Sequence, residues 1–349
     1  MDAVVVAPLL DGVPYVGVTR GRNLESVHRV AACAVDGRGR TIFALGSIDV
    51  PVYLRSTAKP FIAAAAVREG VVERFGLEPH EIALMAASHN GEPFHIEAVG
   101  AILRKIGLPA TALACGPHAP YDPASAEELA RNGVAFTAIH NNCSGKHAGI
   151  LALCRVLEAD AGSYLDVDNP AERRILGLCA RLCGLPVESL QLGVDGCGIP
   201  VFAAPLRNAA LAFARLATLE GIDERDARAL HVVRDAMIAF PQYVAGTGEF
   251  DTALMRAARG RIAAKSGAEG VHGLADITNA TGLVLKVVDG AARACAPAAV
   301  AAIRHLQLLD EDALASLESF ARPPVRNRAG VQVGAILPLA LDGDAANRH

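Results

Sequence analysis

Arg55-Ser56-Thr57-Ala58-Lys59-Pro60-Phe61 is the stretch around which the chain is organised, because it places a serine and a lysine three positions apart at the start of a predicted helix. Residues i and i+3 share a helix face, so the Ser56 hydroxyl and the Lys59 amine are expected to be neighbours. The exposed N–H groups of a first helical turn favour developing negative charge. Burial favours the neutral amine of a lysine. The pair therefore indicates a serine nucleophile with a lysine base.

Composition describes a globular protein and excludes a nucleic-acid binder. The 349 residues are 52% hydrophobic and 4% aromatic, with no Trp and a formal net charge of -4. Such a chain can build one large or two moderate domains, but it lacks the basic surface and the stacking rings that nucleic acid requires. It has no apolar run of about 18 residues and no basic segment like that of a signal peptide. We therefore expect a cytoplasmic enzyme whose partners include neither a membrane nor a nucleic acid.

The basic residues and the cysteines of the chain differ in what they indicate. Of the 33 basic residues only five are lysines, and Lys59, Lys146 and Lys265 each follow small residues. General positive charge is thus supplied by arginine, so these lysines are candidates for specific roles. The eight cysteines, in a chain without a signal peptide, do not indicate a disulfide framework. Most are expected to be small core residues.

The order of predicted elements indicates an α+β fold. Period-two alternation and turn residues predict strands at 13–19, 29–35, 41–45, 261–265, 271–277 and 283–288. Helical periodicity dominates from Ser56 to Arg259, interrupted by a short apolar run at 190–194, and a last helix at 297–308 precedes a polar tail. We expect an α/β sandwich, in which residues 1–55 and 260–349 form an antiparallel sheet domain. Residues 56–259 form an inserted helical domain, with the active site between the two.

A polar segment, 20–28, separates the first two predicted strands. It contains Glu25 and His28. The pattern fits a surface connection and a substrate-facing loop equally well.

Two further motifs follow the Ser56 and Lys59 pair. Ser88-His89-Asn90 ends a helical run, and Lys265-Ser266-Gly267 ends a predicted strand. Each is weak alone, but the order Ser-x-x-Lys, Ser-x-Asn, Lys-(Ser/Thr)-Gly is that of serine β-lactamases and penicillin-binding proteins. His89 replaces an aspartate of that series, and no separate carboxylate motif for deacylation is evident. These departures argue against a true β-lactamase.

Two glycine-flanked turns carry cysteines. Cys143-Ser144-Gly145-Lys146-His147 opens a predicted helix, and Asp195-Gly196-Cys197 follows a short strand. The Gly-Lys pair is not a phosphate-binding loop, because His140 occupies the position of the first glycine and His147 that of the metal-binding hydroxyl. Two cysteines with a lysine or histidine beside one of them could bind zinc.

With these motifs in view, the chain resembles the asparaginase II family, the zinc-containing rhizobial-type L-asparaginases with a serine β-lactamase-like fold. The resemblance extends over essentially the whole chain and depends on six blocks in order: Arg20-Gly21 with Glu25-Ser26-Val27-His28, Arg55-Ser56-Thr57-Ala58-Lys59-Pro60, Ser88-His89-Asn90-Gly91, Asn142-Cys143-Ser144-Gly145-Lys146-His147, Asp195-Gly196-Cys197-Gly198-Ile199-Pro200 and Pro241-Gln242-Tyr243-Val244-Ala245-Gly246. It also implies a homodimer.

The resemblance implies a role for each candidate residue. The predicted assignments are Ser56 as nucleophile with Lys59 as base; Ser88 with Lys265 as a second serine–lysine pair; Cys143, Lys146 and Cys197 as zinc ligands; Asp195 for the substrate's α-amino group; and Arg55 and His147 near its carboxylate, with Glu25 as a further substrate contact. The zinc is expected to position the substrate, because a serine nucleophile is already present.

The function expected from these residues is hydrolysis of L-asparagine to L-aspartate and ammonia through a serine acyl-enzyme. Three alternatives remain open. One is another serine amidohydrolase of the same fold, such as a glutaminase or a penicillin-type amidase. A second is a cysteine hydrolase that uses Cys143 with His147. A third is a sensor that is acylated once and does not turn over, although an amino-acid-binding carboxylate and a metal site argue against it.

Overall fold

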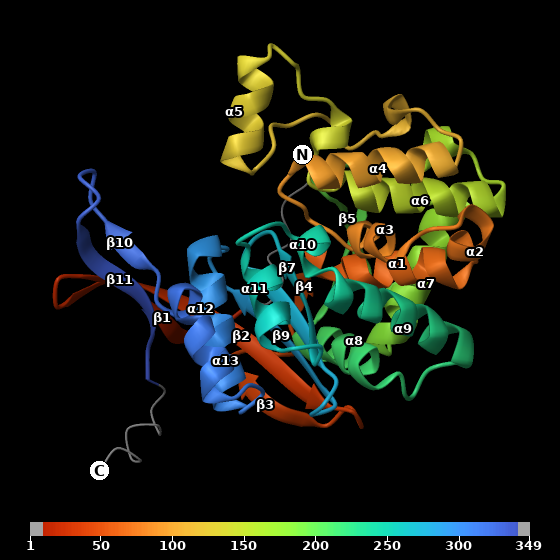
Figure 1. Cartoon of the computed structure of the whole chain (residues 1–349). Helices are drawn as coiled ribbons and strands as arrows, with labels where there is room; N and C mark the ends of the chain where they lie inside the picture. The colour runs from red at the N-terminus through yellow and green to blue at the C-terminus, as the bar shows by residue number, and fades with distance from the viewer. Residues whose placement is uncertain (1–9, 341–349) are drawn as a thin grey trace, which may run out of the picture.

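A curled antiparallel sheet built from both ends of the chain is the framework of the molecule (Figure 1), a computed structural model that describes residues 10–340. Its strand order is β10-β11-β1-β2-β9-β8-β7, and β3 pairs with β2. The strands are β1 (Val13–Arg20), β2 (Asn23–Asp36), β3 (Thr41–Leu45), β7 (Ile262–Gly267), β8 (Val271–Asp276), β9 (Thr281–Val287), β10 (Pro324–Arg326) and β11 (Gln332–Pro338). Every pairing is antiparallel, and β2 meets β9 from Val30↔Val287 to Asp36↔Thr281.

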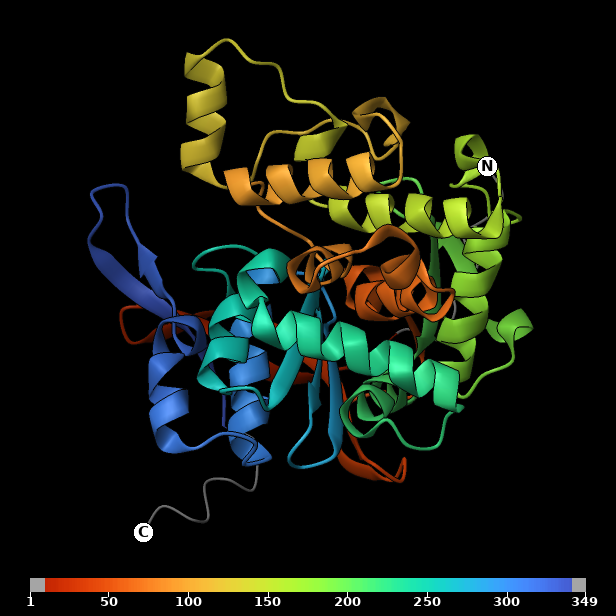
Figure 2. The ribbon, with the colours of Figure 1, turned by 45° about the vertical axis from the view of Figure 1, so that its right-hand side comes forward.

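Helices cover both faces of this sheet. Figures 1 and 2 show α12 (Cys295–His305) on one side of the strands and α8 (Leu206–Thr218) on the other. The helix α8 packs directly on β9. Gly282 of β9 permits this close approach, because a side chain there would overlap the α8 backbone at Ala210. The central strand β2 is therefore covered twice, and its residues Val30 through Val35 are all buried. Such a strand is continuously apolar instead of alternating.

A helical layer surrounds α1 (Lys59–Arg68), which is buried from Lys59 to Val67 and rich in alanine. A helix that is apolar on all sides is covered on all sides, and the small side chains of α1 let α6, α7 and α9 approach it. The remaining helices are α2 (Val71–Phe75), α3 (Pro79–Met85), α4 (Pro93–Lys105), α5 (Pro123–Arg131), α6 (Ser144–Leu157), α7 (Pro170–Cys183), α9 (Glu224–Ala239), α10 (Pro241–Val244), α11 (Phe250–Ala257), α13 (Glu311–Ser316) and α14 (Glu318–Ala321).

A second, three-stranded sheet lies with the helices and has the order β4-β6-β5. It consists of β4 (Pro51–Tyr53), β5 (Gln191–Val194) and β6 (Pro200–Pro205). The turn between β5 and β6 carries Asp195 and Cys197, and β4 leads directly into the Ser56 segment. The small sheet therefore brings two predicted site segments, 140 residues apart, to one place.

The predicted fold class is confirmed, since the antiparallel sheet combines strands from both ends of the chain and the helical segment lies between them in sequence. The division into domains at residues 55 and 260 stays a prediction. Within the first segment, β4 pairs with β6 of the helical part and not with the large sheet.

Two local predictions are wrong. The segment 20–28 is not a loop: β2 begins at Asn23, and a tight turn joins it to β1. The predicted polar tail contains β10 and β11, and β11 pairs with β1 across Val16↔Pro338. Both errors concern strand residues that are mostly exposed or half-buried, where burial imposes little apolar periodicity on the sequence.

No helix among residues 10–340 is long and apolar enough to cross a membrane.

Candidate active site

The Ser56 segment is a short 3-10 helix, Arg55–Ala58, that continues into α1 at Lys59. The predicted helix therefore has a tighter first turn, because Ser56 lies in the 3-10 segment and α1 begins only at Lys59. Arg55 has a φ of 50°, in the left-handed region that is costly for a residue with a side chain. Ser56 therefore follows a strained backbone position, and it is half-buried.

A cavity of ≈ 400 Å³ opens beside Ser56. Its polar lining comes from separate elements of the chain: Ser56, Ser88, Asn90, Asn142, Glu249, Asp251, Lys265 and Ser266. Backbone hydrogen bonds from Ser88 N to Val244 O (2.9 Å) and from Asn90 N to Ala245 O (2.8 Å) hold the Ser-x-Asn triplet along the end of α10. The structure thus brings both serines and Lys265 to one cavity, as the motif order predicts.

Lys59 is 1% exposed and faces Ser88. Its Nζ lies 2.6 Å from the carbonyl oxygen of Ala87, 2.8 Å from Ser88 Oγ and 3.2 Å from Cys143 Sγ. Burial lowers the pKa of the Lys59 amine, Cys143 opposes this shift, and the charge of Lys146 adds to it. A neutral amine at this position is what a general base requires.

The contacts of Lys59 differ in one respect from the predicted pairing of serines with lysines, and the catalytic roles of the pairs stay a prediction. Lys59 bonds Ser88, and among residues 10–340 no hydrogen bond joins its amine to Ser56 Oγ. The physical reason is that a buried amine must satisfy its N–H groups, and Ala87 and Ser88 offer two acceptors at the end of α3. Among residues 10–340, no hydrogen bond joins Ser88 to its predicted partner Lys265, although both residues line the cavity.

Lys265 lies at the end of β7 and is also 1% exposed. Its Nζ donates to Ser266 O at 2.6 Å and lies 3.7 Å from Asp251 Oδ2. Burial lowers the pKa of Lys265 to about 8, with the charge of Asp251 as the main opposing influence. This amine can therefore change its charge near neutral pH.

Cys143, Lys146 and Cys197 converge behind the cavity. Cys143 precedes α6, Lys146 lies in its first turn, and Cys197 lies in the β5–β6 turn. Lys146 Nζ is 2.8 Å from Cys197 Sγ, and the two thiols are hydrogen-bonded to each other. That bond lowers the pKa of Cys143, burial opposes it, and the charges of Lys59 and Lys146 lower it further. The cluster thus favours a thiolate.

These three residues fit a thiophilic metal ion, because buried sulfur and nitrogen donors from two segments point toward one another. Among residues 10–340, no three His, Cys, Asp or Glu side chains form a metal-binding cluster. A metal bound at this position therefore needs Lys146 as a ligand. In the structure the thiolate and Asp195 raise the pKa of Lys146 despite its burial, so metal binding would have to release a proton from its amine.

Asp195 and Arg55 form an ion pair between the metal-ligand candidates and Ser56. Asp195 Oδ1 lies 2.8 Å from Arg55 Nε and 2.7 Å from its Nη2. Burial acts to raise the pKa of Asp195, but the Gly196 N–H bond, Lys146 and Arg55 together lower it. Both side chains line one small pocket with Lys59 and Lys146, so charges of both signs are available there.

His147 and Glu25, the other predicted substrate contacts, lie away from this pocket. His147 is fully buried, and its Nδ1 lies 2.7 Å from the hydroxyl of Tyr164. Burial lowers the pKa of His147 well below its usual value. Glu25 is exposed on β2 and pairs with Arg20 at 2.7 Å. His28 is buried on the same strand and contacts Asp289 at 2.7 Å.

Asp251 is a site residue that the sequence did not reveal. It is the second residue of α11, is 2% exposed and lines the cavity beside Lys265. An aspartate in the first turn of a helix is ordinary, so no local signal marks it. Only the packing of α11 against β7 places it at the site.

Comparison with known proteins decides the family. The family model described as L-asparaginase II matches residues 16–338, nearly the whole chain. The chain belongs to the L-asparaginase II family. No match was found among curated protein sequences.

Solved structures show only distant similarity to this L-asparaginase II family member. The crystal structure of Mglu in its native form in the presence of 4.3 M NaCl is 17% identical, with a TM-score of 0.37 over 81% of this chain and 62% of that chain. The chain thus spans less than two thirds of that Mglu structure. A crystal structure of a protein from Bacteroides dorei DSM 17855, described as a beta-lactamase, is 13% identical over 79% of this chain and 86% of that chain, with a TM-score of 0.40.

Proposed function

We propose that the protein hydrolyses L-asparagine to L-aspartate and ammonia through a serine acyl-enzyme. One observation carries the proposal: in a member of the L-asparaginase II family, Ser56, Ser88 and Lys265 line one cavity, and the buried Lys59 amine contacts Ser88 from behind. Two serines and two lysines then supply a nucleophile, a base and an acid.

Acylation begins with attack of Ser56 Oγ on the side-chain amide carbon of the substrate. Lys59 does not line the cavity, whereas Ser88 does, so the Ser56 proton passes through the Ser88 hydroxyl to the neutral Lys59 amine. Backbone N–H groups beside Ser56 bind the oxyanion, a contribution of about 3 kcal/mol per donor in other enzymes. This route agrees with the observed contact of Lys59 with Ser88.

The leaving group needs a proton before the C–N bond breaks. Lys265, whose pKa is about 8, is protonated at neutral pH and can donate to the amide nitrogen from the cavity wall. Ammonia leaves, and water attacks the β-aspartyl ester while the now neutral Lys265 takes a proton from it. The ester C–O bond then breaks, Ser56 regains its proton from Lys59 through the Ser88 hydroxyl, and L-aspartate is released.

Asp195 and Arg55 suit the two charged groups of a free amino acid. In the structure they neutralise each other. The α-ammonium of the substrate would take the place of Arg55 at Asp195, and its α-carboxylate would bind the released Arg55 guanidinium. This exchange keeps both buried charges paired, and it favours a free amino acid over an amide that lacks the two charges.

Cys143, Lys146 and Cys197 would hold a zinc ion on this proposal. If bound there, the ion would supply a positive charge that helps to orient the substrate. We also propose a homodimer in the cytoplasm, as the family resemblance implies.

The distinguishing experiment is ammonia release from asparagine and glutamine, with a chromogenic β-lactam as a third substrate. We expect turnover of asparagine, loss of at least about 10³-fold in Ser56→Ala, and wild-type rates in the control Ser189→Ala on the exposed surface. Mass spectrometry of quenched enzyme should find the aspartyl adduct on Ser56. An adduct on Ser88 would make that residue the nucleophile, and retained turnover in Ser56→Ala would overturn the covalent mechanism.

Thiol alkylation in the presence of chelator separates the cysteine alternative. His147 contacts Tyr164 and not Cys143, so an activated Cys143–His147 pair is not formed. A glutamine rate equal to or above the asparagine rate would favour the glutaminase alternative.

A further inference from the structure

Asp251 occupies the junction of three elements that build the lysine end of the cavity. From the first turn of α11, its Oδ2 accepts a 2.7 Å hydrogen bond from Ser266 N, and its Oδ1 accepts one of 2.7 Å from Ser266 Oγ. From β8, His272 Nε2 lies 3.2 Å from Oδ1. One buried carboxylate therefore connects α11 to the ends of β7 and β8.

The same carboxylate faces the Lys265 amine. Asp251 Oδ2 lies 3.7 Å from Lys265 Nζ, and both side chains are at most 2% exposed. The amine's shorter bond, 2.6 Å, goes to the carbonyl oxygen of Ser266, the residue that Asp251 holds. Displacing Asp251 would therefore disturb both the neighbour and the counter-charge of Lys265.

We propose that Asp251 is the positioning residue of this active site, which fixes Lys265 in the cavity through Ser266 and keeps its amine protonated for transfer to the leaving group. The proposal goes beyond the family assignment, and its catalytic part rests on the proposed hydrolysis. Asp251 itself does not touch the reacting atoms in this scheme, because it acts through Lys265 and Ser266.

Electrostatics support this assignment. Burial acts to raise the pKa of Asp251, but the His272 hydrogen bond, the charges of Lys265 and His272 and the Ser266 N–H bond together hold it well below the usual value. Asp251 is therefore ionised at any working pH. For Lys265, burial acts to lower the pKa and Asp251 is the first influence that raises it.

The other groups around Lys265 do not replace that carboxylate. Lys59 on α1 lowers the pKa of Lys265, and the Cys143 thiolate raises it less than Asp251 does. Glu249, which precedes α11, lies at the exposed rim of the cavity. His272 on β8 shares Asp251 and is neutral or positive, so it adds no negative charge.

The pH dependence of activity is set by the protonation of Lys265. A protonated Lys265 is required, so activity is lost as the pH rises through the pKa of about 8. Removing the charge of Asp251 lowers that pKa, because an opposite charge at this distance is worth about 1–3 pKa units. The alkaline limb of the kcat/KM profile should therefore move to lower pH in Asp251→Asn.

The test compares Asp251→Asn with Asp251→Glu, which keeps the charge, and with Ser266→Ala, which keeps the carboxylate but loses one hydrogen bond. The 349-residue chain contains only five lysines, so the side-chain carbon next to each amine can be followed by NMR in ¹³C-lysine-labelled protein. In Asp251→Asn, we expect the titration midpoint of the Lys265 resonance and the alkaline limb of the kcat/KM profile to move down together by about 1–3 pH units. In Asp251→Glu and in Ser266→Ala, the Lys265 titration midpoint and the alkaline limb should stay within about half a pH unit of their wild-type values.

Folding and the proposed function have their own readouts. Circular dichroism identifies a variant that does not fold, and Asp251→Ser, which is smaller and also uncharged, then carries the same comparison. An unchanged Lys265 titration in a folded, uncharged variant would overturn the proposal, even if activity fell. A wild-type protein that releases no ammonia from asparagine would overturn the proposed function alone, because the NMR titration needs no substrate.

Discussion

At the scale of single residues, the site depends on a close approach between Gly246 and Asn90. The segment that ends α10 runs beside the Ser-x-Asn triplet, bonded to it through Val244 O and Ala245 O. A side chain at Gly246 would overlap the Asn90 amide, and the φ of 139° at Gly246 also favours glycine. A residue without a side chain is therefore required where two backbone segments hold Ser88 and Asn90.

Gly246→Ala should displace Asn90 and Ser88 from the cavity wall. We expect kcat/KM for the amide substrate to fall at least about tenfold, with a loss of stability of about 1–3 kcal/mol from overlap and backbone strain. The matched control is Gly248→Ala, because Gly248 also has a positive φ, 78°, but has open space around it. Steady-state kinetics and urea unfolding measure both effects. Equal kinetic loss in the two variants would contradict the role of the Asn90 contact.

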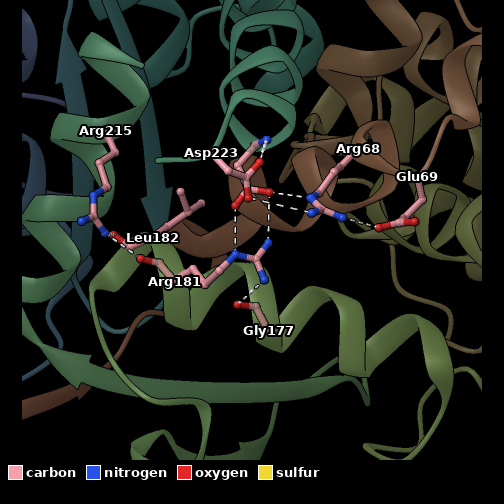
Figure 3. A network of polar contacts seen from close by, with 8 residues as sticks. Arg68, Glu69, Gly177, Arg181, Leu182, Arg215 and Asp223 are labelled. Atoms are coloured by element: carbon pink, nitrogen blue, oxygen red, sulfur yellow. Dashed lines mark hydrogen bonds and ion pairs between the residues drawn. The ribbon is translucent and has the colours of Figure 1, made fainter. Parts of the chain in front are cut away.

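At the scale of elements, one buried aspartate joins three helices. Asp226 of α9 is 1% exposed and accepts hydrogen bonds from Arg68 of α1 and from Arg181 of α7, at 2.9 and 3.0 Å for the latter. In Figure 3 the guanidiniums of Arg68 and Arg181 point toward the carboxylates next to Asp223, and Arg215 is bonded to the backbone of Arg181 and Leu182. The contact fixes α7 and α9 around α1, whose first residue is Lys59.

Asp226→Asn should weaken this three-helix contact without touching the cavity. Two guanidiniums would lose their charged acceptor, and hydrogen bonds to charged groups contribute about 1.5–3 kcal/mol each. Because Arg181 is 48% exposed and is screened by water, we expect a total loss of about 2–3 kcal/mol. Urea unfolding checks this value, and kcat should remain at the wild-type level.

The control for this variant is Asp168→Asn, which removes an ion pair with Arg173 in which both partners are more than half exposed. Exposed pairs contribute little, so its unfolding midpoint should equal that of the wild type. Equal midpoints for Asp226→Asn and the wild type would show that the buried network does not stabilise the helical layer.

At the scale of the whole molecule, the fold brings together ligand candidates that the chain separates. Cys143 and Lys146 come from the start of α6, and Cys197 comes from the small sheet, yet Lys146 and Cys197 approach within 2.8 Å. A metal bound by all three would connect the helical layer to the small sheet. Because such a site forms only in the folded chain, metal binding should stabilise that chain.

Zinc should therefore raise the unfolding temperature of the metal-free protein. With zinc at about 100 times its dissociation constant, the expected gain is about 2.7 kcal/mol. Cys197→Ser should lose most of this gain, whereas Cys154→Ser, a buried thiol farther along α6, should keep it. Calorimetry and metal analysis test both variants. Stabilisation of Cys197→Ser equal to that of the wild type would exclude the proposed ligand set.

The strands and helices that form the core were predictable because burial imposes a period on the sequence. The predicted strand at 271–277, for example, corresponds to β8, which is buried throughout. The strands β10 and β11 were harder to predict, because their residues are mostly exposed or half-buried and because β11 pairs with β1 across about 320 positions of the chain.

By itself the sequence determined the family, the fold class and three of the residues that line the cavity, Ser56, Ser88 and Lys265. These follow from motifs, from hydrophobic periodicity and from the rarity of lysine, all of which are local properties of the chain. The tertiary structure alone decided which lysine contacts which serine, and it alone placed Asp251 beside Lys265. The reason is physical: Ser56 and Lys59 are neighbours in sequence, but a buried amine turns toward the acceptors that packing brings to it. The opening Ser-x-x-Lys motif thus specifies the chemistry of the site, and the packing of α3 and α11 specifies its geometry.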